Sequence, residues 1–230
     1  VEMRSGIIQD KRKLKLLSKK WPLIPFEKVL KDVSGGNIKI PQKEFLNEGT
    51  IPIVDQGKKL VAGYTNNTDA IHKSNGNVII FGDHTKIFKH VDFPFAMGAD
   101  GVKVLKPVTE NVDLKYLYYY FNTLKIPESG YNRHYKFIKD IVIPLPPLST
   151  QKKIAAILDK AQALIDNDKK VLEKYDQLAQ SLFLEMFGDP VRNEKGWETN
   201  KLSELGNWQS GGTPSKKKEE YFTGNIPWLT

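Results

Sequence analysis

The longest uninterrupted pattern in the sequence lies between residues 151 and 187, a stretch without proline or glycine. Within it, apolar residues recur at intervals of seven in three neighbouring series, one of which Asp168 interrupts. Apolar residues at strict seven-residue intervals over about four heptads are typical of a coiled coil rather than of a helix on a globular surface. The predicted coiled-coil interface consists of Ile154, Ile157, Leu158, Ala161, Leu164, Ile165, Val171, Leu172, Tyr175, Leu178 and Leu182.

This spacer helix is expected to occupy residues 149–188. Ser149 or Thr150 suits the N-cap, and Gly188 with Pro190 ends the pattern. A single helix with such an apolar stripe is not stable alone, so it needs a partner helix. We expect that partner to be a second copy of the chain, in a homodimer, or another subunit.

An internal repeat sets the domain organisation. Ser34-Gly35-Gly36 matches Ser210-Gly211-Gly212 at an offset of 176 residues, and the same offset aligns Trp21 with Trp197. The alternative is chance similarity around a glycine-rich turn. If the repeat is real, a second unit begins near Trp197. Residues 189–230 are too few to bury a normal core, so this segment is expected to be the start of a second, truncated unit.

The first unit, residues 21–148, reads mostly as short strands with one helix. β-rich runs bounded by glycine, asparagine or proline occur at residues 51–54, 77–81, 101–105 and 140–145. Residues 111–123 have helical apolar spacing, with Asn111 or Asp113 as cap. We therefore predict an α+β protein: a mixed α/β domain with a small twisted sheet, followed by a long coiled-coil helix.

Four tyrosines, at positions 116, 118, 119 and 120, cluster in the predicted helix. They could stack on nucleic-acid bases, but such a cluster more often packs a helix onto a sheet, and we favour the packing interpretation.

Three loops combine glycine with amide, basic and aromatic side chains, which are the groups that approach a DNA backbone and read base edges. They are residues 55–59, 82–86 and 130–136. The alternative is that they are ordinary solvated loops. The predicted DNA-binding residues are Gln56, Lys58, Lys59, His84, Lys86, Tyr131, Asn132, Arg133, His134 and Lys136.

The net charge of +8 permits nucleic-acid binding without requiring it, because phosphate is bound by local patches. Residues 1–20, a basic extension, hold seven basic and two acidic side chains and so contribute +5. This extension is either an arm that touches phosphate or a solvated helix, and we favour the helix. The absence of cysteine fits a reducing cytoplasm. No apolar run suggests a membrane span or a signal peptide.

No catalytic constellation is recognisable. Glycine-rich phosphate loops and the Asn/Asp-Pro-Pro-aromatic tetrad of amino-methyltransferases are absent, and the four histidines lack zinc-ligand spacing. His84 beside Asp83 resembles an acid–base pair, but a structural or DNA-facing histidine is the better interpretation. We expect no enzyme activity, cofactor or metal.

Two motifs together resemble the specificity subunits of type I restriction-modification systems. The run IPLPPLSTQKKI at residues 143–154 is similar to the junction from a target-recognition domain into the family's helix. Trp197, the run SGGTPS at residues 210–215 and the run IPWL at residues 226–229 resemble the opening of such a domain. The resemblance covers about residues 21–230.

The resemblance implies a non-catalytic subunit that binds double-stranded DNA. A complete member has two recognition domains, each reading half of a split site, and two antiparallel helices that set the gap. Methyltransferase subunits dock beside the helices, and restriction subunits join them. This sequence departs from that pattern in its second domain and lacks the second helix, so a dimer would restore both and read a palindromic site. The alternatives are a coiled-coil scaffold with a protein-binding head and a remnant that only recruits methyltransferase subunits.

Overall fold

The computed structural model describes residues 11–99, 101–127, 133–212, 215 and 217–223. The chain divides into two compact units, residues 1–167 and 168–230. Helix α5 (Leu148–Phe187) contributes to both, and we call residues 21–147, which precede it, the head. None of the helices in the described part of the chain is long and apolar enough to cross a membrane.

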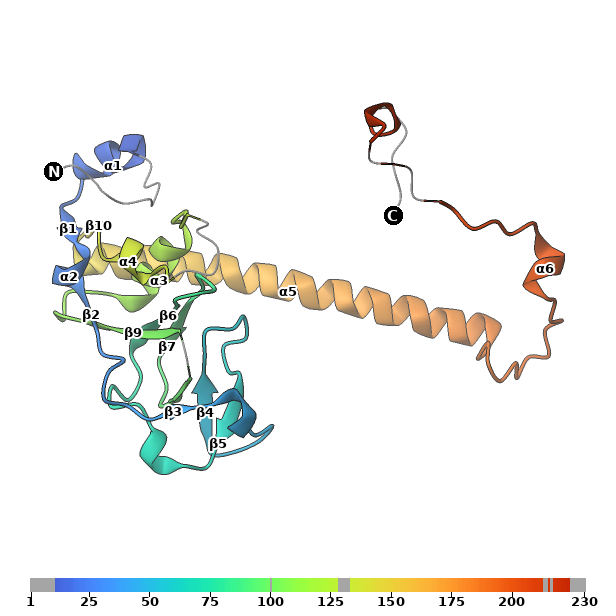
Figure 1. Ribbon diagram of the computed structural model, residues 1–230, viewed down its shortest axis with the longest axis horizontal. Helices are drawn as coiled ribbons and strands as arrows, with labels where there is room; N and C mark the ends of the chain where they lie inside the picture. Colours follow the sequence, from blue (N-terminus) through green and yellow to red (C-terminus); the bar gives the residue numbers. More distant parts are fainter. Residues whose placement is uncertain (1–10, 100, 128–132, 213–214, 216, 224–230) are drawn as a thin grey trace. The chain divides into compact units, whose positions relative to one another are not determined.

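The centre of the head is an antiparallel sheet with the strand order β2-β9-β6-β7 (Figure 1). Its strands are β2 (Leu30–Asp32), β9 (Val102–Pro107), β6 (Val78–Gly82) and β7 (Phe88–Val91). All of β6 is buried because its alternating side chains enter two different cores. Ile79 and Phe81 pack in the core on one face, and Val78 and Ile80 pack in the core on the other.

A second sheet, in the order β3-β8-β4-β5, packs against the central one. Its strands are β3 (Lys39–Ile40), β8 (Ala96–Gly98), β4 (Ile51–Val54) and β5 (Gly63–Thr65). β8 runs parallel to both β3 and β4, whereas β4 and β5 are antiparallel. Val54 of β4 and Met97 of β8 share a core cluster with Ile80 of β6, so side chains from both sheets fill one interior.

The two ends of the head are joined by a short sheet. β1 (Leu23–Pro25) pairs antiparallel with β10 (Val142–Pro144), about 120 residues away in sequence. The one-turn helix α2 (Phe26–Val29) follows β1, and the side chains of Phe26 and Val29 enter the core under the helices. The chain therefore closes the head immediately before α5 begins.

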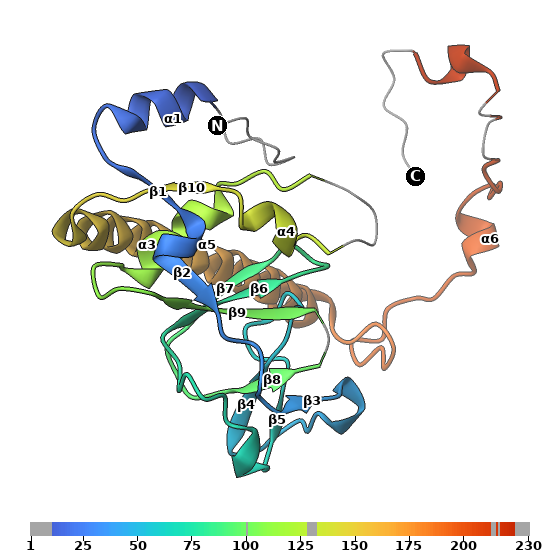
Figure 2. The same ribbon diagram turned by 60° about the vertical axis from the view of Figure 1, so that its left-hand side comes forward.

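Helix α3 (Leu114–Asn122) lies between the central sheet and the first turns of α5 (Figures 1 and 2). Asp113 caps it, since its carboxylate accepts a hydrogen bond from the N–H of Tyr116 at 2.8 Å. Leu117 and Phe121 are buried against the sheet. The predicted helix is confirmed, with Asp113 rather than Asn111 as its cap. The shorter α4 (Tyr135–Ile138) completes this layer.

The short helices and turns complete the element list. They are α1 (Lys11–Ser18), η1 (Gln42–Glu44), η2 (Thr68–Ala70), α6 (Leu202–Leu205) and η3 (Glu219–Tyr221). α1 shows that residues 11–18 of the basic extension are helical, as we favoured. The four predicted strand runs correspond to β4, β6, β9 and β10. The predicted α+β fold with a long helix after the head is confirmed, and the strands of the head form three sheets.

α5 begins earlier than its predicted caps. The N–H groups of Thr150 and Gln151 both donate to the carbonyl oxygen of Pro147, at 2.8 and 3.0 Å. Ser149 and Thr150 therefore lie inside the first turn, and the prediction that one of them is the N-cap was wrong. At the other end, Gly188 has φ +78° and its N–H donates to Leu184, as expected for a terminating glycine.

The second unit contains a one-turn helix at a position that the sequence repeat relates to the head. α6 lies 176 residues after α2, at the offset of the sequence repeat. Leu202 and Leu205 are about two-thirds exposed, whereas the equivalent Phe26 and Val29 are buried. Trp21 and Trp197 make different contacts, since the Trp197 indole donates to the carbonyl of Phe187 at 2.7 Å. The local conformation repeats, but the packing around it does not.

Candidate nucleic-acid interface and helix face

Asp83 joins the loop after β6 to two other segments. It is 3% exposed, and its N–H donates to the carbonyl of Gly101 at 2.6 Å. Its carboxylate accepts from the N–H of Tyr135 at 2.7 Å. Its carbonyl oxygen accepts from the N–H of His134 at 3.0 Å and lies 2.8 Å from Nδ1 of the same residue. The predicted loops at residues 82–86 and 130–136 therefore meet at one residue.

Gln56 brings the third loop to the same place. Its side-chain oxygen accepts from the N–H of His84 at 3.3 Å, and its carbonyl accepts from the hydroxyl of Thr85 at 2.6 Å. Gly101, with φ +65°, lies against both side chains: a Cβ there would be 2.7 Å from Oε1 of Gln56 and from Cδ2 of His84. Only a residue without a side chain fits this contact without displacing them.

The loop that carries Gln56 is anchored by a lysine of β7. Lys89, which is 5% exposed, donates to the carbonyl of Asp55 at 2.7 Å and forms an ion pair with its carboxylate at 3.3 Å. Burial lowers the pKa of Lys89, and the carboxylate of Asp55 partly offsets this effect. The same carboxylate accepts from the N–H of Gly57 at 2.8 Å and so holds the turn.

The predicted DNA-binding residues differ in exposure. Lys58, Lys59, Arg133 and Lys136 are exposed. Gln56, His84 and Lys86 are partly buried. Tyr131 and Asn132 lie outside the described residues.

His134 does not have the surface position that its prediction requires. Its side chain is 1% exposed, and its backbone N–H and Nδ1 both approach the carbonyl oxygen of Asp83. A buried imidazole in this position cannot reach DNA. We therefore correct its role to holding the segment before α4 against the loop after β6.

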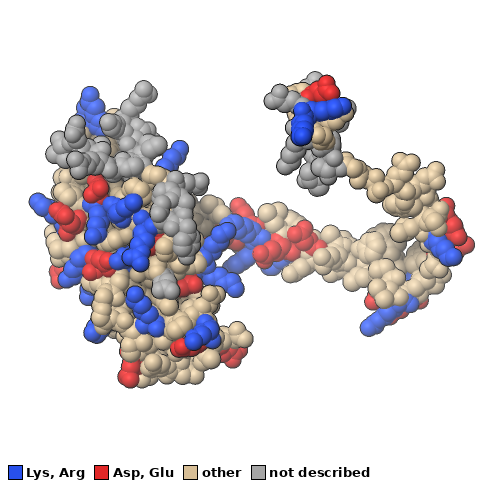
Figure 3. Space-filling model, viewed as in Figure 1, with Lys and Arg blue, Asp and Glu red and all other residues tan. Residues whose placement is uncertain are grey.

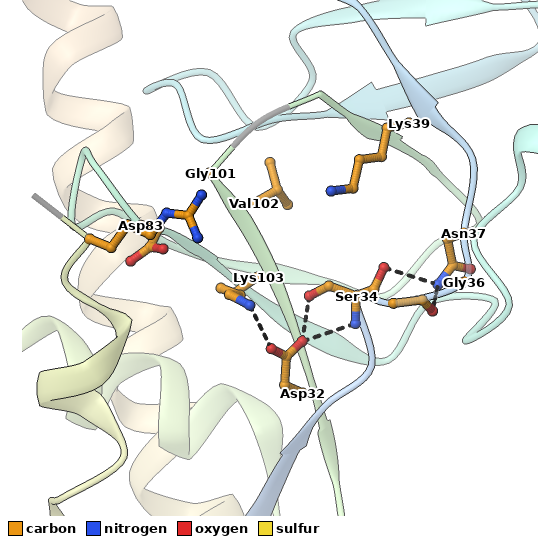
Figure 4. Close-up of a pocket in the computed structure, with 11 residues that line it drawn as sticks. Asp32, Ser34, Gly36, Asn37, Lys39, Asp83, Gly101, Val102 and Lys103 are labelled. Carbon is orange, nitrogen blue, oxygen red and sulfur yellow. Dashed lines mark hydrogen bonds and ion pairs between the residues drawn. The ribbon is translucent and has the colours of Figure 1, made fainter.

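A groove beside these loops was not predicted. It has a volume of about 490 Å³ and lies between the segment at residues 32–39 and the start of β9 (Figure 4). Lys39, Lys103 and Arg133 contribute its basic groups, and only Arg133 was selected from the sequence. The Ser34-Gly35-Gly36 motif lines the groove, and its repetition in the sequence is the signal from which the groove could have been found.

The tyrosines of α3 pack as we favoured. Tyr116 is buried, and its hydroxyl donates to the carbonyl of Pro144 at 2.6 Å. The hydroxyl of Tyr120 donates to the carbonyl of Val142 at 3.0 Å, so both tyrosines hold β10. Tyr118 packs against the same core. Tyr119 instead faces α5, where its hydroxyl donates to the carboxylate of Asp159 at 2.8 Å.

The first turns of α5 pack on the head. Gln151 is fully buried; its amide donates to the carbonyls of Pro146 at 2.8 Å and Asn111 at 3.0 Å and accepts from the N–H of Asp113 at 2.9 Å. Ile154 packs against the core under the helices. Its assignment to the coiled-coil interface is therefore corrected, because its side chain already contributes to the head.

Asp159 links this part of α5 to α3. Lys115 donates to its carboxylate at 2.7 Å. This bond, with that from Tyr119, outweighs the effect of burial and lowers the pKa of Asp159. The hydrogen bond to Asp159 raises the pKa of Lys115. The pKa of Tyr119 is raised to about 12, mainly by burial and also by its hydrogen bond to Asp159.

The variant Asp159→Asn is expected to lower the free energy of unfolding by about 0.5–1 kcal/mol at pH 7, because the ion pair is partly exposed. A carboxyl with a lowered folded pKa stabilises the fold above its unfolded pKa of 3.8 and loses this effect as pH falls through the folded value. Thermal unfolding at pH 7 and pH 3 should therefore show a difference from wild type that shrinks in acid. Asp176→Asn, which removes an exposed helix carboxylate, is the control.

Beyond these turns the heptad residues are exposed. Their exposed fractions range from 37% at Leu158 to 66% at Ile157 and Leu164. The other large apolar members are Ile165, Val171, Leu172, Tyr175, Leu178 and Leu182. Within their own units these side chains leave an exposed apolar stripe along α5.

Basic residues do not form one continuous patch. On the face shown in Figure 3, lysine and arginine side chains alternate with aspartate and glutamate over the head. Any anion site on this face is therefore local.

The fold has counterparts in known proteins. A family model described as the type I restriction modification DNA specificity domain matches residues 27–175. The chain belongs to this family.

Other members of the specificity family extend the comparison. The chain is 36% identical over 212 residues to a type I restriction enzyme specificity subunit from Escherichia coli. This alignment covers 83% of the chain and 50% of the E. coli protein. The chain is 29% identical over 144 residues to another such subunit from Methanocaldococcus jannaschii, covering 52% and 33%. The chain thus spans half or less of the length of these curated relatives.

A solved structure supports the fold of this specificity-family chain. The S subunit of a type I restriction-modification system from M. genitalium superposes with a TM-score of 0.52 at 18% identity. The match covers 77% of this chain and 48% of that one.

Proposed function

We propose that this chain is a DNA-recognition component of a type I restriction-modification complex and has no catalytic role of its own. The observation that carries the proposal is the convergence of three loops, far apart in sequence, at Asp83, Gln56 and Gly101. Loops held together on a rigid sheet are how folds present binding groups. Membership of the DNA specificity family supports the choice of duplex DNA as the ligand.

Within this interface we assign different roles to different side chains. Gln56 is the candidate base reader: its oxygen is held by His84, while its amide nitrogen has no partner among the described residues. An amide group can read adenine in the major groove. Lys58, Lys59 and Lys136 are exposed cations of the converging segments and are suited to backbone phosphates.

The exposed stripe of α5 is the proposed assembly surface. We expect it to pair with the same helix of a second copy, because a seam of large apolar residues at seven-residue spacing is self-complementary. Methyltransferase subunits, and through them restriction subunits, are the further proposed partners. Residues 189–230 are proposed to open a second recognition domain, since α6 repeats α2 at the offset of the sequence repeat.

Salt dependence of DNA retention tests the proposal. Fluorescence anisotropy of the whole chain with a labelled duplex should show binding at low salt that weakens steeply as salt rises, through counterion release. A coiled-coil scaffold with a protein-binding head would show no DNA retention even at low salt, and that result would reject the proposed function.

Gly101→Ala is expected to alter the sequence preference without unfolding the head. The left-handed backbone at this position costs a Cβ-bearing residue about 1 kcal/mol, and the side chains of Gln56 and His84 must move away from the new methyl group. We expect binding to the preferred duplex to weaken at least tenfold, while binding to a scrambled duplex is kept. Paired titrations with the two duplexes measure this.

Gly206→Ala is the matched control, because no atom lies within 4 Å of its Cβ position. An unchanged preference in the Gly101→Ala variant would remove Gln56 and His84 from base reading.

A further inference from the structure

The groove beside the converging loops has a floor whose polar side chains already make hydrogen bonds within the protein. The amide nitrogen of Asn37 donates to the carbonyls of Val33 at 3.1 Å and Gly35 at 3.0 Å, and its oxygen accepts from the N–H of Lys73 at 3.0 Å. The hydroxyl of Ser34 donates to Asp32 at 2.5 Å and accepts from the N–H of Val104 at 2.8 Å. Neither side chain is available to read a base.

The acidic group of the floor is also satisfied. Asp32 forms an ion pair with Lys103 at 2.8 Å (Figure 4). Burial works to raise the pKa of Asp32, but hydrogen bonds from Lys103 and Ser34 outweigh it and the pKa is lowered. The carboxylate therefore stays ionised and neutralises Lys103, so this pair adds little net charge to the groove.

Two cations of the groove form no ion pair with a described residue, although the lining also includes Asp83, whose buried carboxylate accepts from the N–H of Tyr135. Lys39 and Arg133 both line the groove and are exposed, and within the described part of the chain neither side chain has a hydrogen bond or an ion pair. Figure 4 shows Lys39 extending toward the open centre. What the groove offers to a ligand is therefore positive charge rather than a directed pattern of donors and acceptors.

Glycine opens one wall of the groove to a bulky ligand. No atom lies within 4 Å of the Cβ position of Gly35, and Gly36 has φ +69°. A wall without side chains allows the backbone of another polymer to come close. Gly101, on the opposite side, also contacts Gln56, so the groove is continuous with the proposed base-reading loops.

We propose that this groove binds a backbone phosphate of duplex DNA through Lys39 and Arg133, and that it supplies affinity without sequence preference. The inference rests on the proposed function and deepens it, because it separates the phosphate contact from the base contacts at Gln56. It also gives the Ser34-Gly35-Gly36 motif a role: its side chain is fixed and its glycines leave room for the DNA backbone.

The test is the double variant Lys39→Ala with Arg133→Ala in the whole chain. Its affinity is measured across a salt series for two duplexes, one enriched from a random pool by the wild type and one scrambled. Affinity should fall at least tenfold at ~0.1 M salt, equally for both duplexes, and the slope of log affinity against log salt should become shallower by about 1, because one phosphate contact is lost. Lys39→Arg with Arg133→Lys keeps the charge and should restore binding.

Lys28→Ala with Lys43→Ala removes two exposed head lysines outside the groove and is the matched control. Unchanged affinity and slope in the groove variant would overturn the phosphate assignment, and a loss confined to the preferred duplex would show that the groove reads bases instead. If the wild type binds neither duplex, the proposed function fails together with this inference.

Discussion

Replacing Asp83 with alanine is expected to lower the free energy of unfolding by about 2–4 kcal/mol, a large share of the 5–15 kcal/mol typical of a domain. The substitution leaves the buried N–H of Tyr135 without its acceptor at 2.7 Å. The segment before α4 is then held to the loop after β6 only by backbone and histidine contacts. Urea denaturation measures the loss, and sequence-specific DNA binding should fall with it.

The variant Asp83→Asn distinguishes the effect of the hydrogen bond to Tyr135 from the effect of the negative charge. Its amide oxygen can still accept from Tyr135, so most of the stability should return. Asp92→Ala, which removes an exposed acidic residue of the head, should change the free energy of unfolding by less than about 0.5 kcal/mol. An Asp83→Ala variant as stable as wild type would show that the loops do not depend on this residue.

Leu164→Glu combined with Leu178→Glu is expected to abolish self-association. Both leucines lie on the exposed stripe of α5, and each substitution occurs twice in a dimer. Four lost apolar contacts at about 1.5 kcal/mol each amount to roughly 6 kcal/mol, which raises the dissociation constant by about four orders of magnitude. Sedimentation velocity should show dimeric wild type and monomeric variant at micromolar concentration.

Ala163→Glu combined with Gln177→Glu is the matched control. These residues are next to the two leucines in sequence but lie on the opposite face of the helix, so the same added charge should leave the dimer intact. A strictly monomeric wild type would contradict the homodimer and leave a different subunit as the partner of the stripe.

The long helix and most strands were predictable because their signals are local. Heptad spacing and the absence of proline and glycine define residues 151–187 without any knowledge of the rest of the fold. Glycine and proline likewise bracket β4 and β9. The three polar loops were also visible locally, because each follows or precedes an apolar run.

Contacts between distant residues were not predictable. Asp32 and Lys103 are separated by 71 positions, and nothing in either segment indicates that they form the floor of a groove. His134 resembled its exposed neighbours, although its backbone and ring are both held by Asp83. Ile154 fits the heptad pattern as well as Leu164 does, but the head covers the first turns of α5 and takes Ile154 into its core.

The convergent loops are proposed to read a DNA sequence. A binding selection from random duplexes, with the whole chain and the proposed methyltransferase subunits, is the direct test of this proposal. We expect a defined sequence to be enriched, with two half-sites related by two-fold symmetry. Recovery of unselected sequences, bound with the same affinity as the starting pool, would contradict the account.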